Sequence, residues 1–135
     1  MSHTVRIASF AGTLALAGVV FLMGALFVPH NASTSSGEVR VIHLVVHNMA
    51  YYVSGRNEPN PTLHLRRDER VQIIVTNQDA GMKHDFVVDA WQKRTSLIDG
   101  IGEARVEFVT PSVPGEAVYS CTPHGALMRG TIRIE

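Results

Sequence analysis

Alternation of apolar and polar residues is the clearest pattern in this chain, and it recurs along its last three quarters. In the run 39–46, Ile42, Leu44 and Val46 fall on one face of an extended strand, while His43 falls on the other. Because successive side chains point to opposite faces of a strand, this pattern predicts a β-strand that buries one face.

Similar runs mark further strands, and turn residues separate them. Strands are expected at 62–65, 71–76, 85–89, 105–109, 116–120 and 130–135. Charged, Gly-rich or Pro-rich turns lie at 66–70, 77–81 and 111–115. No helical periodicity follows residue 30, so about seven short strands predict an all-β protein, a β-sandwich. Tyr51, Tyr52 and the residues 60–63 are interpreted as packing and turn residues of the long first connection.

A different pattern occupies the N-terminus. Residues 7–28 form a run of 22 uncharged, mainly apolar residues, which is long enough to cross a bilayer as a helix. The alternative is a signal peptide, whose apolar region is usually about 7–15 residues long and ends at a small-x-small cleavage site. The nearest cut, after Ala32, would place His30 where a small residue is preferred. We therefore expect residues 1–29 to be an uncleaved transmembrane anchor, with Arg6 on the cytoplasmic side.

The remainder of the chain has the composition of a linker and one small domain. The polar residues 30–37 are interpreted as a flexible linker, and residues 38–135 are enough for one small domain. The chain has 12 Lys+Arg and 12 Asp+Glu, and it lacks the basic and aromatic patches of nucleic-acid-binding proteins, so no nucleic-acid partner is expected. Its single cysteine, Cys121, cannot form an internal disulfide.

The candidate chemistry lies in the loop between the last two predicted strands. Cys121, His124 and Met128 fall within eight residues, and His84 lies 37 residues before the cysteine. Taken singly, each of these residue types is more often structural than a ligand. Together they offer one thiolate, two imidazoles and one thioether, the donor set of a trigonal copper site with a weak axial ligand. We therefore predict that these four residues bind copper.

The same segments resemble the cupredoxin family, which includes plastocyanin, amicyanin, pseudoazurin and azurin. Residues 81–88 (GMKHDFVV) are similar to the strand start that carries the family's first histidine ligand. Residues 111–128 are similar to the family's Pro-Gly-x-Tyr-x-Cys-x-x-His…Met block. The resemblance covers essentially all of residues 38–135. It implies a Greek-key β-sandwich that binds one copper ion and shuttles single electrons as Cu(I) and Cu(II) interconvert.

Two features depart from the family pattern. The gap of three residues between His124 and Met128 occurs in azurin, but there with a longer Cys-to-His spacing. The residue after the first histidine is usually Asn, which ties the two ligand loops together, and here it is Asp85. An ionised Asp85 would accept hydrogen bonds from the ligand loop and favour the oxidised copper; the alternative is a partly exposed carboxylate. Thr122 and its neighbouring backbone are candidate donors to the cysteine sulfur.

The sequence thus predicts a membrane-anchored blue copper protein that faces the periplasm or another extracytoplasmic space and turns over no substrate. We expect a monomer that exchanges single electrons transiently with redox partners such as cytochromes or oxidases. The resemblance implies an apolar docking patch, formed here by Met82, Gly125, Ala126 and Leu127.

Two alternatives stay open for the function. A periplasmic copper chaperone or storage protein would favour exposed Met-rich or His-rich sites without a thiolate, and Cys121 argues against it. A nitrosocyanin-like copper enzyme would lack the axial methionine and keep an open coordination position, and Met128 argues against it. The remaining histidines of the strands, His43, His47 and His64, are interpreted as surface residues.

Overall fold

The structure is a computed structural model that describes residues 37–135. The membrane anchor predicted for residues 1–29 lies outside the described residues, and so does the linker predicted for 30–37 apart from Gly37. In the described range, no helix is long and apolar enough to cross a membrane.

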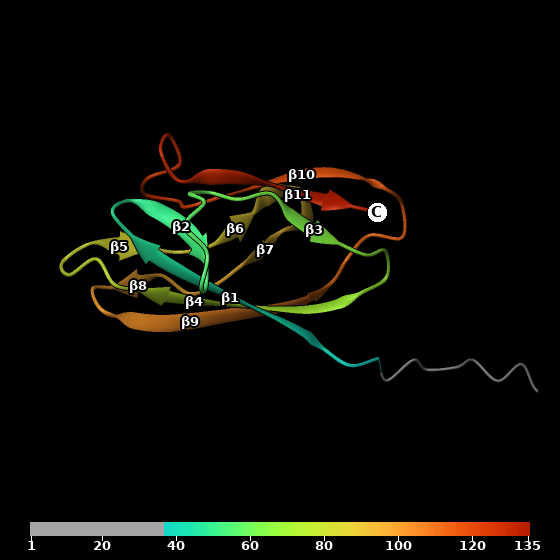
Figure 1. The fold of residues 1–135 in the computed structure, drawn as a ribbon, viewed down its shortest axis with the longest axis horizontal. Helices are drawn as coiled ribbons and strands as arrows, with labels where there is room; N and C mark the ends of the chain where they lie inside the picture. The colour runs from blue at the N-terminus through green and yellow to red at the C-terminus, as the bar shows by residue number, and fades with distance from the viewer. Residues whose placement is uncertain (1–36) are drawn as a thin grey trace, which may run out of the picture. The chain divides into compact units, whose positions relative to one another are not determined.

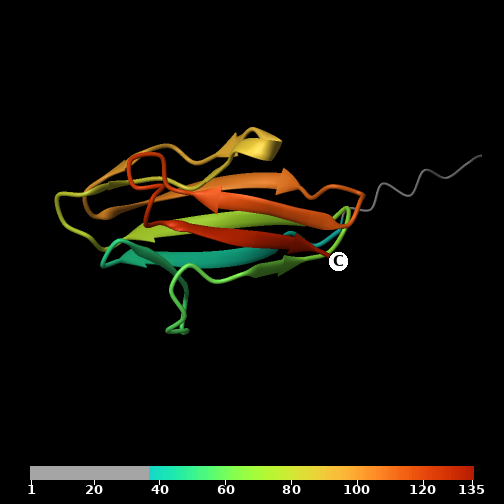
Figure 2. The ribbon, with the colours of Figure 1, turned by 90° about the horizontal axis from the view of Figure 1, so that it is seen from above.

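Two β-sheets pack face to face around one core (Figures 1 and 2). The first sheet has the order β2-β1-β4-β9, with bounds Ala50–Val53, Arg40–His47, Arg70–Asn77 and Gly102–Val109. The second has the order β3-β11-β10-β6-β7, with bounds Leu63–Leu65, Arg129–Ile134, Gly115–Ser120, Val87–Val88 and Lys93–Arg94. A separate short pair, β5 (Lys83–His84) and β8 (Ile98–Asp99), and one 3₁₀ turn, η1 (Asp89–Trp91), complete the described part. The predicted all-β sandwich is confirmed.

Period-two alternation explains how the core is filled. Ile42, Leu44 and Val46 of β1 are all buried, as their shared face predicts. The second sheet contributes Tyr119 of β10 and Ile132 of β11 to the same apolar cluster. Burial of apolar surface is the main favourable term in folding, so this shared cluster is what holds the two sheets together.

The first connection differs from the expectation. Tyr51 and Tyr52 belong to β2, which pairs with β1 in antiparallel fashion through a tight turn at Asn48 and Met49. Both turn residues have positive φ, 50° and 59°, which is the backbone that two-residue hairpin turns require. A non-glycine residue is uncommon there, so the sequence carries only a weak signal for this hairpin.

The strand expected at 85–89 is also different, because only Val87–Val88 of it forms a strand, β6, while β5 ends just before it at His84. The backbone between them makes contacts outside any strand ladder. The carbonyl of Asp85 accepts a hydrogen bond from the Tyr51 hydroxyl, and the N–H of Phe86 donates to Thr95 Oγ1 at 3.1 Å. These contacts replace strand pairing at Asp85 and Phe86.

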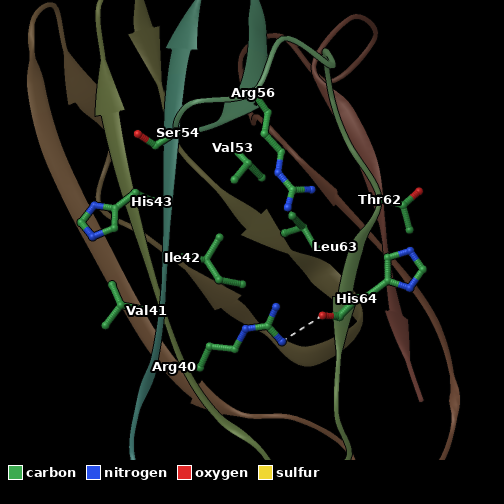
Figure 3. Close-up of a pocket in the computed structure, with 10 residues that line it drawn as sticks. All are labelled: Arg40, Val41, Ile42, His43, Val53, Ser54, Arg56, Thr62, Leu63 and His64. Atoms are coloured by element: carbon green, nitrogen blue, oxygen red, sulfur yellow. Dashed lines mark hydrogen bonds between the residues drawn. The ribbon is translucent and has the colours of Figure 1, made fainter.

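At one open edge of the sandwich, Arg40 of β1 reaches toward the second sheet (Figure 3). Its guanidinium donates to the carbonyl oxygen of His64 in β3 at 3.0 Å and lies 3.4 Å from the carboxylate of Glu69. The groove around it, of about 430 Å³, is also lined by the apolar side chains of Ile42 and Leu63. Because Arg40 is engaged by its own chain, we interpret it as a bridge between the sheets.

The sandwich has two distinct ends. The loop between β10 and β11 lies at one end, close to β5, and the described chain begins and ends at the other (Figure 1). The segment with the predicted ligands therefore lies far from residue 37, where the predicted linker joins the domain.

Packing between β10 and β11 generates a stability prediction. Gly130 lies against the fully buried ring of Tyr119, and a Cβ at position 130 would overlap the Tyr119 hydroxyl. That hydroxyl is held by a hydrogen bond to Pro61 O at 2.6 Å. We expect Gly130→Ala to lower the free energy of unfolding by about 1–3 kcal/mol, because overpacking forces the ring to move. Urea unfolding followed by the fluorescence of the single tryptophan, Trp91, measures it.

Gly115→Ala is the matched control, because Gly115 lies in β10 and a Cβ there would meet nothing within 4 Å. Its expected effect is within about 0.5 kcal/mol, as for ordinary surface changes. Equal losses in the two variants would show that Tyr119 does not constrain position 130.

Candidate metal centre

The segment between β10 and β11 is closed by its own backbone. The N–H of Cys121 donates to Met128 O at 3.0 Å, and the N–H groups of Leu127 and Met128 each donate to His124 O at 2.9 Å. The two strands pair directly below it, at Ser120 and Arg129. The sheet therefore fixes both ends of the loop, and the internal bonds fix its turn.

His84 comes from a different part of the chain, the short strand β5, where it pairs with Ile98 of β8. The loop before it is pinned by Asn77, whose side-chain amide donates to Met82 O at 3.0 Å and to Gly100 O at 2.7 Å. The His84 side chain is fully buried, with 0% of its surface exposed. A buried polar ring in a fixed segment needs a partner for each ring nitrogen.

Three predicted ligand atoms converge at this point. The Nδ1 atom of His84 lies 3.7 Å from Cys121 Sγ, and the Nδ1 atom of His124 lies 3.8 Å from the same sulfur. Among the described residues, these three side chains form a group that could hold a metal ion, with ligand atoms within 4.8 Å of one another. His84 is distant from the loop in sequence, and the fold brings it there.

The spacing fits a bound metal. Typical metal–nitrogen bonds of about 2.0–2.1 Å and metal–sulfur bonds of about 2.3 Å, at trigonal angles, separate nitrogen and sulfur by about 3.8 Å. A thiol has one hydrogen, so it can donate to only one of the two imidazoles. A soft thiolate with two imidazoles is the donor set that favours copper. The side chains are therefore arranged as a type 1 copper site requires.

Burial opposes charge on two of the predicted ligands before a cation binds. Burial, together with the charge of His124, lowers the pKa of His84 below its ordinary value. Burial likewise raises the pKa of the Cys121 thiol. A neutral imidazole is the form that binds a metal, whereas the thiol must lose its proton to do so. Loading the site is therefore expected to release a proton from Cys121.

Met128 is fully buried and is tied through its backbone to Cys121 and His124, as described above. It therefore belongs to the same compact loop as two of the predicted ligands. Its assignment as the weak axial ligand stays a prediction.

Asp85 joins the two ligand segments. It is 5% exposed, which excludes the alternative of a partly exposed carboxylate. Its Oδ1 accepts from the N–H of Thr122 at 2.6 Å, and its Oδ2 accepts from Thr122 Oγ1 at 2.7 Å. The expected hydrogen bonds from the ligand loop are confirmed. The hydrogen bonds of Thr122 expected at the cysteine sulfur go to Asp85 instead, because the carboxylate is the stronger acceptor.

Two further residues, Asn60 and Tyr51, support the site, and no signal in the sequence identifies them as part of it. Asn60 accepts from the N–H of Tyr51 at 3.1 Å and donates to Leu127 O at 3.0 Å, so it fastens the ligand loop to β2. Tyr51 donates its hydroxyl to the carbonyl of Asp85. The sequence alone indicates only packing or turn roles for both. Their partners lie 67 and 34 residues away in the chain, beyond any local motif.

The remaining histidines of the strands, His43, His47 and His64, are not part of the group of three predicted ligands. The His47 ring stacks on Tyr52 with centroids 4.0 Å apart, and His64 Nδ1 lies 2.7 Å from the carboxylate of Glu135. His43 and His64 are exposed, in agreement with the interpretation as strand-surface residues.

Comparison with solved structures identifies the fold. Auracyanin A, a "blue" copper protein from Chloroflexus aurantiacus, aligns with a TM-score of 0.56 at 16% identity, over 73% of this chain and 100% of that one. The dithionite-reduced auracyanin of Roseiflexus castenholzii aligns with a TM-score of 0.58 at 17% identity, over 73% of this chain and 99% of that one. Rusticyanin from Thiobacillus ferrooxidans aligns with a TM-score of 0.50 at 21% identity, over 74% of this chain and 79% of that one. The chain has the cupredoxin fold. Its sequence matches no protein-family model and no curated protein.

Within the cupredoxin fold of this chain, the four predicted ligands come from two segments. His84 lies in the short β5 segment, and the other three lie in the loop between β10 and β11. The resemblance of two short motifs to cupredoxins is therefore confirmed at the level of the fold, although identity to the solved structures is low.

Proposed function

We propose that this protein is a membrane-anchored type 1 copper protein that carries single electrons between redox partners on the extracytoplasmic side of a membrane. The observation that carries the proposal is the convergence of His84 Nδ1 and His124 Nδ1 on Cys121 Sγ at 3.7 and 3.8 Å. A copper ion held there would supply a one-electron couple and a thiolate-to-copper charge-transfer band.

The ligand segments are held rigidly, and this rigidity favours electron transfer. Hydrogen bonds from Thr122, Asn60 and the loop's own backbone fix the ligand segments before any ion binds. A preorganised environment has little to rearrange when charge changes. Each cycle takes one electron from a reduced partner and passes one to an oxidised partner, with no bond made or broken in the protein.

The route to the surface runs through the half-buried ring of His124. Leu127, in the same loop, is 65% exposed, and Met82, just before β5, is 36% exposed. Ile101, which sequence reasoning did not include, is 67% exposed and follows Gly100, whose N–H donates to Met82 O at 3.0 Å. Exposed apolar residues of this kind suit a small, transient contact with a redox protein. We propose that such partners include cytochromes or oxidases, and that the protein acts as a monomer.

The first test is colour. Copper-loaded, oxidised protein is expected to absorb intensely in the visible region, and Cys121→Ser is expected to abolish that band, because the band needs the thiolate. Optical and EPR spectra of the full-length protein measure this. A colourless Cu(II) form, or a band that survives the substitution, would instead favour a copper chaperone or storage site.

The second test addresses the docking patch. Leu127→Glu is expected to slow electron exchange with a cytochrome or second copper protein, because a charge would be desolvated on contact. Its optical spectrum should stay that of the wild type, since residue 127 is not a predicted ligand. Stopped-flow kinetics measure the exchange, with Val113→Glu as a control at another exposed apolar position. Azide or nitrite that binds the copper directly, with turnover, would place the protein in the enzyme class.

The third test addresses the anchor. Because residues 7–28 are uncharged and no good cleavage site follows, full-length protein is expected to stay with membranes after carbonate extraction. N-terminal sequencing should find Met1 or Ser2. A mature soluble protein that begins near residue 33 would identify the segment as a signal peptide, and would leave the copper proposal intact.

A further inference from the structure

The predicted ligand set gives a role to Nδ1 of His84 but none to its second ring nitrogen, Nε2. Its Nδ1 faces Cys121, but its Nε2 is buried and has no hydrogen-bond partner of good geometry among the described residues. The near acceptor is Oδ2 of Asp79, at 3.3 Å from Nε2. A buried N–H without a partner costs about 1–3 kcal/mol, so an acceptor at this distance has a physical reason to be there.

Asp79 is itself held in place on several sides. Its Oδ1 accepts from the N–H of Asn48 at 2.8 Å, and its Oδ2 accepts from the N–H of Met49 at 3.1 Å. Its own N–H donates to Asn77 Oδ1 at 2.9 Å. The acceptor beside Nε2 is therefore a carboxylate whose two oxygens are both fixed by backbone donors.

The tautomer of His84 follows from these contacts. A neutral imidazole carries one hydrogen, on either Nδ1 or Nε2. Because both oxygens of Asp79 accept hydrogen bonds from backbone N–H groups, the carboxylate favours the hydrogen on Nε2 and leaves the Nδ1 lone pair toward Cys121. Histidines that bind metals commonly donate their other N–H to a carboxylate in this way, which fixes the ring and raises its basicity.

We propose that Asp79 is a positioning residue of the metal centre, whose carboxylate accepts the Nε2 hydrogen of His84 and couples that ring to the β1–β2 turn. This inference rests on the proposed metal-binding role of His84. It adds a third tether to those made by Asp85 and Asn60, and it also places a fixed negative charge behind one ligand. That charge favours the more positive, oxidised state of the centre.

Asp79→Asn is the informative variant, since it keeps the shape of the side chain. Its carbonyl oxygen can replace only one carboxylate oxygen, and when it replaces Oδ1, beside the N–H of Asn48, its NH₂ group takes the place of Oδ2 and faces Nε2. The expected results are a shift of the His84 hydrogen to Nδ1 in the metal-free protein, at least about a tenfold loss of copper affinity and a raised reduction potential. Asp99→Asn is the matched control. It removes the same charge from an exposed carboxylate that pairs with Lys83, the residue before His84, at 3.0 Å.

Three measurements on the full-length protein test the proposal. Nitrogen-15 NMR of the metal-free protein reports the His84 tautomer, with its signals assigned by their loss in His84→Gln. Competition titration reports the copper affinity, and voltammetry reports the potential. The expected wild-type tautomer has its hydrogen on Nε2, and the Asp99→Asn protein should match the wild type in tautomer and, within about twofold, in affinity.

A hydrogen on Nδ1 in the wild-type metal-free protein would overturn the proposal, even if Asp79→Asn fails to fold. So would an Asp79→Asn protein with the tautomer, affinity and potential of the Asp99→Asn protein. Failure of the proposed function looks different, because the wild-type protein would then hold no coloured copper while its His84 tautomer stays as expected.

Discussion

The two hydrogen bonds from Thr122 to the buried carboxylate of Asp85 join the two parts of the chain on which the metal centre depends. One part is the β5 segment with His84, and the other is the loop between β10 and β11. Neither part alone supplies a complete donor set. Since their acceptor is a buried carboxylate, the two bonds are stronger than ordinary surface contacts. The position of the carboxylate one residue after His84 sets how far that ring lies from Cys121.

Backbone carbonyls around the centre are paired with side chains from other parts of the chain, and these pairs explain the residues found there. The carbonyl of Asp85 is occupied by the Tyr51 hydroxyl, and the carbonyl of Leu127 is occupied by the Asn60 amide. Both contacts reach back to β2 or to the connection after it. The hairpin of β1 and β2 therefore supports the site as well as the core. The positive φ values at Asn48 and Met49 belong to the same arrangement, because their N–H groups point at Asp79.

Local and distant features differ in how far the sequence predicts them. Cys121, His124 and Met128 are close in the chain, so their spacing alone indicated a common site, and the alternation in β1 indicated its buried face. The strand β2 was missed because its turn uses Asn48 and Met49, without the glycine that usually marks a tight hairpin. Asp79, Asn60 and Tyr51 were missed because their roles depend on partners in other strands. Thr122 was expected to donate to the cysteine sulfur, but it donates to Asp85. The burial of Asp85 makes its carboxylate the preferred acceptor, and that burial follows from tertiary packing, which the sequence does not show.

Electrostatics links these contacts to redox behaviour. In the centre, a buried thiol and two imidazoles lie near two carboxylates. Asp85 lies on the side of the ligand loop, and Asp79 lies behind His84. In a site of low effective dielectric, each negative charge stabilises an added positive charge more than it would in water. Both carboxylates therefore favour the oxidised state, while the burial of the centre opposes any net charge. The reduction potential of this protein is expected to depend on the balance between the carboxylate charges and the burial of the centre. The packed loop leaves the ligands little freedom to relax when the charge changes.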